Sequence, residues 1–548
     1  MNDTQARSGD EAVIRTPAGV TTGPLDKRRQ SWVLAACVLG SSMAFIDSSV
    51  VNVALPKMES ELQTTLAYMT WVINAYTLCM SALLLIGGAA ADQIGRRRIF
   101  MIGITIFSIA SIGCGIAPTV ETLILSRAVQ GVGAALLIPC SLAIIGAAFG
   151  EKERGAAIGI WSGASAIAAG SSPLVGGWLV DHVSWRAIFL INPVIALPTI
   201  LIALRHVPES IDVEAKKGLD AAGAALAFFG LGSLVYGLIA ASERGWSSPI
   251  VLGAILLGLI LLVAFVAAER RSPTPMMPLN VFQSLTFSGV NILTLLLYGA
   301  LGGMMFFLPF LLIQVHGYSA TEAGAAFLPF TIILGVLSKW GGGLVDRFGA
   351  RLPLIIGPTI VAVGVALIAV PGTGGAYWTT FFPPMAVLGF GMAVTVAPLT
   401  TTVLNSVAQH QTGVASGINN AVAQVASLLL IAILGTVGIA TLNHSLNQRL
   451  TNAAPEVRKI GEMARSGFVM PAPPPGTPQQ TQEAARTLIA NSFLDTIRRV
   501  MMITTALCLA SAAAAAFTIK SSTASRESPS APSRPTGLSR APKPPSRE

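Results

Sequence analysis

The chain has 548 residues, of which 53% are apolar and only 11% are charged, and its net charge is +9. Soluble domains carry roughly 25% charged residues, so this composition excludes a soluble enzyme with several domains. The apolar runs do not alternate with polar residues, which excludes a transmembrane β-barrel. Because a membrane-spanning helix uses about 20 apolar residues, the composition predicts an all-α polytopic membrane protein.

The apolar runs are fourteen in number, and each is long enough to cross a bilayer. They cover about 32–55, 68–91, 99–117, 121–148, 155–180, 187–204, 221–241, 249–267, 286–314, 323–344, 352–371, 377–404, 414–441 and 500–519. Residues 1–31 and 521–548 are polar and rich in Gly, Pro or Ser, and we predict that both are disordered tails. The five cysteines all lie within apolar stretches and are expected to be small core residues.

The basic residues predict the orientation, because cytoplasmic loops carry an excess of Lys and Arg. With a cytoplasmic N-terminus, 23 of the 35 lysines and arginines fall in cytoplasmic segments, and only Lys57, Arg186 and Arg244 fall in short external loops. We therefore predict a multi-pass protein of the cell (inner or plasma) membrane with both termini cytoplasmic. These signals account for the positive charge, so the expected partner is the lipid bilayer and not a nucleic acid.

The segment 442–499 is predicted to be an external loop of the C-terminal half. Its centre, residues 471–476, has the sequence PAPPPG, and its second half, about 480–499, has the pattern of an amphipathic helix. We expect no packed core around 468–480, so that deletion of this stretch would leave membrane insertion intact.

An internal repeat divides the chain. Residues 88–97, GAAADQIGRR, follow the second predicted span, and residues 342–351, GGLVDRFGAR, follow the tenth. Asp92 and Asp346 hold equivalent places in the two copies, 254 residues apart. Duplicated halves around a central cavity are typical of transporters. The predicted parts are an N-terminal six-helix bundle at 32–205, two inserted helices with their linkers at 206–285, and a C-terminal six-helix bundle at 286–520.

Four motifs resemble the major facilitator superfamily and, in particular, its branch of fourteen-helix drug:proton antiporters. Residues 88–97 resemble the signature between the second and third helices of the superfamily. Residues 46–56, IDSSVVNVALP, resemble the first-helix pattern of that branch, and residues 127–134 resemble its fourth-helix pattern. Residues 185–192 match the start of its sixth helix. The motifs fall on the expected spans in order.

The resemblance implies a fold and a function. The fold is two six-helix bundles related by a pseudo-two-fold axis normal to the membrane, plus two inserted helices. The function is proton-coupled export of amphipathic, often cationic or lipophilic, drugs and toxic compounds by alternating access. The fifth-helix exporter pattern G-P-x-x-G-G stands here as residues 172–177, SPLVGG, with serine in place of the first glycine. A carrier for one specific metabolite, taken up or exported, is the nearest alternative, and a channel or membrane sensor is a remote one.

Motifs for soluble chemistry are absent from the sequence. It contains no G-x-x-x-x-G-K-[ST] phosphate loop and no H-E-x-x-H metal motif. We therefore predict that the protein is not an enzyme and uses no cofactor or metal. The expected partners are a small-molecule substrate and protons, with a periplasmic adaptor as an open possibility if the organism has two membranes.

The candidates for proton coupling are Asp47 and Arg127. A charged carboxylate near the bilayer centre costs about 2.5–3.5 kcal/mol on insertion scales, so such residues are usually functional or paired. At about 1.5 Å per helical residue, Asp47 lies roughly 15 Å from the outer boundary and Arg127 roughly 13 Å. The two are expected to meet at one depth. They would then form either a coupling site, in which Arg127 toggles the protonation of Asp47, or a static ion pair between two helices.

The repeated motif supplies the candidates for a conformational latch. In the family, the aspartate of this motif docks onto the opposite half when the cytoplasmic side is closed. The alternative interpretation is that the arginines simply anchor the protein at the cytoplasmic side. The latch candidates are Gly88, Asp92, Gly95, Arg96, Arg97, Asp346 and Arg347.

Small and polar residues within the spans supply the remaining candidates. Small residues let membrane helices approach closely, and polar ones either line a cavity or bond to a neighbouring helix. The gating and packing candidates are Gly131, Pro173, Gly176 and Gly177. The cavity candidates are Asn52, Asn74, Tyr76, Gln130, Tyr298 and Asn419.

Overall fold

The computed structural model describes residues 13–16, 19–21, 26–211, 220–273, 275–407 and 412–519. Within these ranges, fourteen helical segments are long and apolar enough to cross a membrane. This confirms the predicted number of spans. Residues 1–12 and 520–548, which hold most of the predicted tails, lie outside the described ranges.

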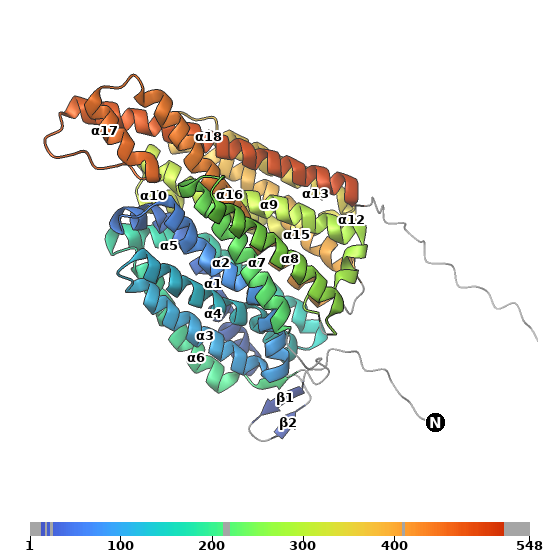
Figure 1. The fold of residues 1–548 in the computed structure, drawn as a ribbon. Helices are drawn as coiled ribbons and strands as arrows, with labels where there is room; N and C mark the ends of the chain where they lie inside the picture. Colours follow the sequence, from blue (N-terminus) through green and yellow to red (C-terminus); the bar gives the residue numbers. More distant parts are fainter. Residues whose placement is uncertain are drawn as a thin grey trace, which may run out of the picture.

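The N-terminal half is a six-helix bundle, in the lower part of Figure 1. Its helices are α1 (Lys27–Glu61), α2 (Leu66–Ile94), α3 (Arg96–Gly115), α4 (Val120–Ala148), α5 (Glu151–His182) and α6 (Ala187–His206). Helix α4 packs against α2 and α3, while α1 packs against α5, α6 and α4. Helices α1 and α4 therefore face one another inside this half.

The C-terminal half is also a bundle of six spans, and several of its spans are broken. The tenth span divides into α10 and α11 at residues 326–327, close to Pro329, whose ring cannot donate a backbone hydrogen bond. The half consists of η1 (Leu279–Gln283), α9 (Leu285–Phe310), η2 (Leu311–Val315), α10 (Ala320–Ala325), α11 (Leu328–Gly342), α12 (Leu344–Phe348), α13 (Arg351–Ile368), α14 (Tyr377–Thr380), α15 (Phe382–Asn405), α16 (Thr412–Leu450), α17 (Pro455–Met463), η4 (Ala464–Ser466) and α18 (Gln479–Thr518).

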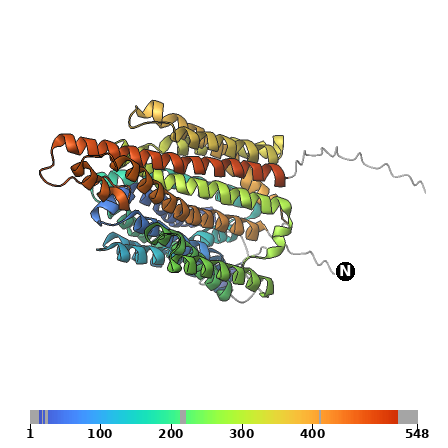
Figure 2. The ribbon, with the colours of Figure 1, turned by 45° about the horizontal axis from the view of Figure 1, so that its top comes forward.

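The two inserted helices are α7 (Ala221–Arg244) and α8 (Pro249–Arg271), which form a hairpin at the side of the halves (Figures 1 and 2). Helix α7 contacts α2 of one half and α16 of the other, and Leu78, Val235 and Leu428 share a small apolar core there. Only 11% of the apolar window of α8 is buried within the protein. Most apolar side chains of α8 are therefore left uncovered by the described part of the protein, which suits contact with lipid.

The predicted disordered tail at 1–31 is wrong in part. β1 (Val13–Thr16) pairs antiparallel with β2 (Gly19–Thr21) and with β3 (Glu209–Ile211), which gives a sheet in the order β2-β1-β3. Val13, Ile14 and their neighbours are mostly β-branched, which favours strands. Helix α1 also begins earlier than predicted, at Lys27.

The predicted segment at 442–499 begins too early, because α16 continues to Leu450. The start of α18 at Gln479 agrees with the helix predicted over about 480–499. Figure 1 shows α17 and the start of α18 beyond the ends of the other helices. We call this end of the molecule the α17 face. The opposite end, where α1 begins and α18 ends, is the terminal face.

The stretch that begins at residue 468 has the packed core that we did not expect. Phe468 is 1% exposed, and its ring centroid lies 5.5 Å from that of Phe307, 6.1 Å from Phe310 and 5.1 Å from Phe493. The backbone N–H of Met470 donates to Gln314 Oε1 at 2.9 Å. A single aromatic residue therefore anchors the Pro-rich segment on the C-terminal half.

Candidate functional site

A buried ion pair joins α1 to α4 in the N-terminal half. Arg127 Nη1 donates to Asp47 Oδ2, and the two side chains are 1% and 0% exposed. The same Nη1 donates to Gln130 Oε1 at 2.7 Å, and Nε donates to the carbonyl of Val72 at 3.1 Å. The predicted meeting of Asp47 and Arg127 at one depth is thus confirmed.

The other oxygen of Asp47 is held by two amides. Gln130 Nε2 donates to Oδ1 at 2.8 Å and Asn192 Nδ2 at 3.3 Å. Both amides also donate to Ser111 Oγ, at 3.2 and 2.9 Å, and that hydroxyl donates to the carbonyl of Phe189. Helices α1, α3, α4 and α6 thereby share one polar cluster in an otherwise apolar bundle.

Aromatic rings cover the guanidinium group. Its Cζ lies 4.2 Å from the ring centroid of Tyr76 and 5.8 Å from that of Phe189, within the range of cation–π attraction. Gly131 makes the Tyr76 contact possible, because a Cβ there would lie 2.3 Å from the carbonyl oxygen of Tyr76. The predicted packing role of Gly131 agrees with this geometry.

The ion pair is not repeated at the two equivalent positions of the C-terminal half. Leu301 follows Asp47 by the 254 residues that separate the two motif aspartates. Met385 follows Arg127 by 258 residues, the separation of Gly131 from Gly389. Leu301 and Met385 are buried and apolar.

A cavity of about 390 Å³ lies between the halves, lined by α1, α2 and α5 on one side and α9, α11 and α16 on the other. Neighbouring residues of α1 serve the two sites, since Asp47 faces the polar cluster while Ser48 lines the cavity. The lining residues are Ser48, Ser49, Asn52, Val53, Ile73, Thr77, Ala169, Gly170, Pro173, Gly302, Met305, Phe327, Phe330, Thr331, Leu334, Gln424, Ser427 and Ile431.

Of the six cavity candidates, Asn52 alone is among the residues that line this cavity. Gln130 and Tyr76 belong to the polar cluster, and Asn74 is fully buried. Asn419 bonds within the C-terminal half, to Asn291 and Thr294. Tyr298 lies beside the cavity residue Ser427, whose hydroxyl donates to its carbonyl. Direction around the helix, which sequence position alone does not set, decides which polar residues of a span line the cavity.

Helices α5 and α10 close the α17 face. Asp181 at the end of α5 accepts hydrogen bonds from the backbone N–H groups of Ala320 and Thr321, at 3.0 and 2.7 Å, and from Thr321 Oγ1 at 2.5 Å. A Cβ at Gly177 would lie 2.1 Å from the carbonyl oxygen of Ala320. A carboxylate of one half thus caps a helix of the other, and no motif in the sequence indicates this contact.

The other small residues of α5 also pack closely. A Cβ at Gly176 would lie 2.0 Å from Val50 Cγ2, and one at Gly324 would lie 2.0 Å from the carbonyl oxygen of Pro173. Pro173 cannot donate to the carbonyl of Ala169, and Ser172 Oγ donates to it instead at 2.8 Å. The serine that departs from the exporter pattern therefore satisfies the carbonyl that the proline leaves free.

Toward the terminal face, α5 and α11 separate. A Cβ added at Gly159 or Gly163 on α5, or at Gly335 on α11, would meet no heavy atom within 4 Å. Helix α5 is therefore packed more tightly against the C-terminal half at the α17 face than toward the terminal face.

Asp92 and Arg96, two latch candidates of the first motif copy, bond within the N-terminal half. Arg96 Nη2 lies 2.7 Å from Asp92 Oδ1, and Arg96 Nη1 donates to the carbonyl of Ala143. The backbone N–H of Arg97 donates to Glu209 Oε1 at 3.0 Å, beside Gly95, whose φ of 128° suits glycine. A Cβ added at Gly88 would lie 3.6 Å from the side chain of Pro139. Arg347 is exposed, and the side chain of Asp346 lies outside the described part.

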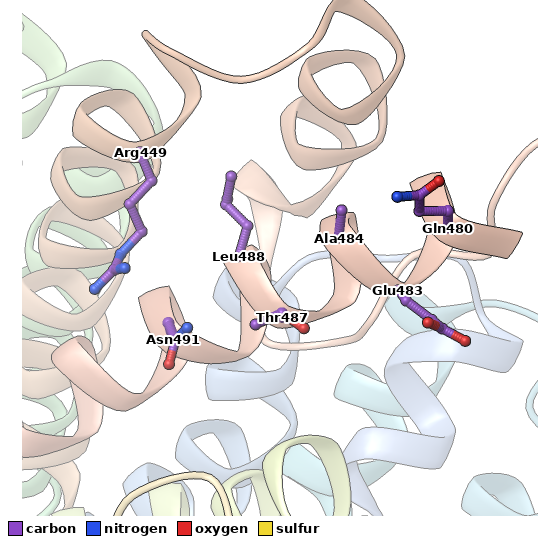
Figure 3. A pocket seen from close by; sticks show the side chains of 7 residues that line it. All are labelled: Arg449, Gln480, Glu483, Ala484, Thr487, Leu488 and Asn491. Carbon is purple, nitrogen blue, oxygen red and sulfur yellow. The ribbon is translucent and has the colours of Figure 1, made fainter. Parts of the chain in front are cut away.

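A second hollow, of about 590 Å³, lies on the α17 face between the end of α16 and the first turns of α18 (Figure 3). Polar side chains predominate in it, among them Arg449, Gln480 and Glu483. Arg449 Nη2 lies 2.8 Å from Asp495 Oδ2 in the same half. This hollow belongs to one half alone, so the cavity between the halves is the candidate transport site.

Two halves around a central cavity, with a buried ion pair beside it, define a secondary membrane transporter. Comparison with known proteins gives the family. The sequence matches the Major Facilitator Superfamily over residues 37–221 and 216–431, and the chain belongs to that family. It is a transporter and not an enzyme.

Similar proteins cover most of the chain. Multidrug resistance protein Stp of Mycobacterium tuberculosis is 33% identical over 78% of this chain and 80% of its own length. The tetracenomycin C resistance and export protein of Streptomyces glaucescens is 30% identical over 92% of this chain and 95% of its own length. Among solved structures, a bacterial homolog of the human lysosomal transporter Spinster, inward-facing and unoccupied, has a TM-score of 0.58 at 18% identity, covering 89% of this chain and 98% of that one. That likeness shows the fold.

Proposed function

We propose that this protein exports amphipathic or lipophilic drug-like compounds in exchange for protons, by alternating access. The single observation that carries the proposal is the buried Asp47–Arg127 pair one residue from the wall of the central cavity. Relatives named for multidrug resistance and for tetracenomycin C resistance and export support drug-like substrates.

The terminal face is cytoplasmic in this proposal, and both termini lie inside the cell. The support is the excess of Lys and Arg in the loops of that face. The structure then corresponds to an inward-facing state, because α5 and α10 close the outer α17 face. Substrate would enter the cavity from the cytoplasm or the inner leaflet.

Asp47 is the proton carrier in this mechanism. A proton on Asp47 would remove the attraction to Arg127, and the amides of Gln130 and Asn192 could still bond to the neutral acid. Four helices meet at the cluster. A change in the charge of this pair therefore changes the free-energy difference between the two conformations of the transporter.

Asp92 acts as the latch of the cytoplasmic side. It bonds to Arg96 within its own half here, and it would dock onto the C-terminal half when that side closes. Asp346 and Arg347 would serve the second copy of the motif in the same way. The gating role of Pro173 fits its place in the cavity wall and against Gly324.

Transport in inverted vesicles tests the proposal. A panel of fluorescent drug-like dyes should accumulate in vesicles that contain the parent protein when an inside-acid proton gradient is imposed, and the Asp47→Asn variant should lose this uphill accumulation. Gradient-independent equilibration of the dyes by the parent would contradict proton-coupled export. Accumulation of one metabolite alone would favour the specific-carrier alternative.

A further inference from the structure

The wall of the central cavity carries no ionisable side chain among its eighteen lining residues. The acid closest in sequence, Asp47, is fully buried on another side of α1. Its oxygens bond to Arg127, Gln130 and Asn192. A cation in the cavity would therefore find no free carboxylate, and the ion pair behind the wall has no net charge to offer.

The wall has seven polar side chains, and five of them donate to backbone carbonyls, so that they offer a ligand mainly their oxygen atoms; Ser49 and Gln424 are the other two. Four hydroxyls donate to backbone carbonyls of their own or a neighbouring helix: Ser48 to Phe45 at 2.9 Å, Thr77 to Ile73 at 3.1 Å, Thr331 to Phe327 at 3.3 Å and Ser427 to Tyr298 at 3.3 Å. The amide of Asn52 likewise donates to the carbonyl of Ser48 at 3.3 Å. Each of these groups keeps oxygen lone pairs for a ligand.

The rest of the wall is apolar, with Met305, Phe327, Phe330, Leu334 and Ile431 on the C-terminal side. A phenyl face attracts a cation only weakly, and the cost of removing a permanent cation from water exceeds that attraction when no counter-ion is present. An uncharged ring system escapes that cost and gains from apolar burial. The volume of about 390 Å³ lies in the range of drug-sized sites.

We propose that the cavity selects uncharged amphipathic molecules, with an apolar ring system and O–H or N–H donors, over permanent cations. This inference rests on the proposed function, and it narrows the substrate class that the family resemblance implies. The donors of the ligand would bond to the hydroxyl oxygens of Ser48 and Thr77 and to the side-chain oxygen of Asn52.

A matched series of anthracene probes tests the inference on the purified full-length protein. The three probes are 9-anthracenemethanol, its methyl ether, and the trimethyl(9-anthracenylmethyl)ammonium ion. The alcohol should bind at least tenfold more tightly than the cation and several-fold more tightly than the ether. Equal or tighter binding of the cation, or no saturable binding of the alcohol, would overturn the inference.

If the lining residues determine which ligand charge the cavity prefers, a substitution among them should reverse that preference. Asn52→Asp places a carboxylate in the cavity and should raise affinity for the cation about tenfold, more so at high pH, while Asn52→Ser should not. An unchanged cation affinity in Asn52→Asp at every pH would contradict the assignment of this wall. Size-exclusion profiles of both variants check their folding.

Transport of the same probes separates the two proposals. Uphill export of the cation, at the rate of the alcohol, would leave proton-coupled export standing and refute the uncharged class. Preferential binding of the alcohol without proton-driven export of any probe would leave the inference about the cavity standing and refute the proposed function.

Discussion

Arg127 and Asp47 lie 80 residues apart in the chain and meet as a buried pair, and Arg127 also bonds to Gln130 and to the carbonyl of Val72. The guanidinium is thus fixed by three partners from three different turns or helices. Any change in the charge of Asp47 alters an arrangement that holds α1, α2 and α4 together.

Arg127→Lys should lower proton-driven transport at least tenfold and shift its pH optimum. Lysine keeps the charge, but it lacks the planar fork that reaches Asp47, Gln130 and Val72 at once. The measurement is the initial rate of dye uptake into inverted vesicles across a range of pH. Arg205→Lys, at an exposed arginine near the end of α6, is the matched control. A parent-like profile for Arg127→Lys would show that the geometry of the fork is unimportant.

Asp181→Asn should loosen the α17 face and favour the conformation open on that side. An asparagine can accept with one oxygen only, so the variant loses bonds that a carboxylate makes to Ala320 and Thr321, worth about 1–3 kcal/mol in total. Spin labels at Thr119 and Thr373, on exposed loops of the two halves, should show a larger population at long distance.

The five native cysteines are buried, which favours selective labelling of the introduced sites. Asp495→Asn is the control for Asp181→Asn, because Asp495 pairs with Arg449 within one half. Identical distance distributions for the parent and Asp181→Asn would mean that Asp181 does not hold the face closed.

Asp92→Asn should lower turnover while substrate binding stays within about twofold. Asp92 lies at the terminal face, paired with Arg96, so the change alters the balance of two states and not the cavity. Labels at Gly150 and Phe348 report that balance, and Glu153→Gln is a control on the same face. A loss of binding equal to the loss of turnover would point to a structural defect instead of a latch.

Phe468→Ala should destabilise the α17 face by about 3–5 kcal/mol, the usual range for truncating a buried phenylalanine. The ring contacts Phe307, Phe310 and Phe493. A lower melting temperature in detergent is the readout. Pro475→Ala, at an exposed position of the same segment, should melt like the parent. A melting temperature unchanged by Phe468→Ala would mean that the segment does not stabilise the fold.

The sequence best predicts those features of the fold that follow from a simple pattern along the chain. Apolar runs predict all fourteen spans, because the bilayer fixes their length. Depth along two helices is enough to bring Asp47 and Arg127 together. Depth does not give direction around a helix, and so it could not decide that the cavity candidates Gln130 and Tyr76 belong to the polar cluster instead.

Other parts of the site depend on tertiary packing that no local pattern records. Asn192 and Ser111 complete the polar cluster, and a polar residue in mid-span was the signal that could have identified them. The role of Asp181 could not be predicted, because it stands in the sequence as an ordinary residue at a helix end and its partners lie in the other half. The burial of Phe468 could not be predicted either, because the prolines that follow it are typical of a loop.

Substrate-induced proton release from the purified protein tests the central claim most directly. The parent in weakly buffered detergent solution should release protons when a transported compound is added, because substrate binding and a proton on Asp47 favour different conformations. Asp47→Asn has nearly the same size and cannot release a proton, so it should bind the compound and release none. Undiminished release from Asp47→Asn would contradict the account and place the proton carrier elsewhere in the chain.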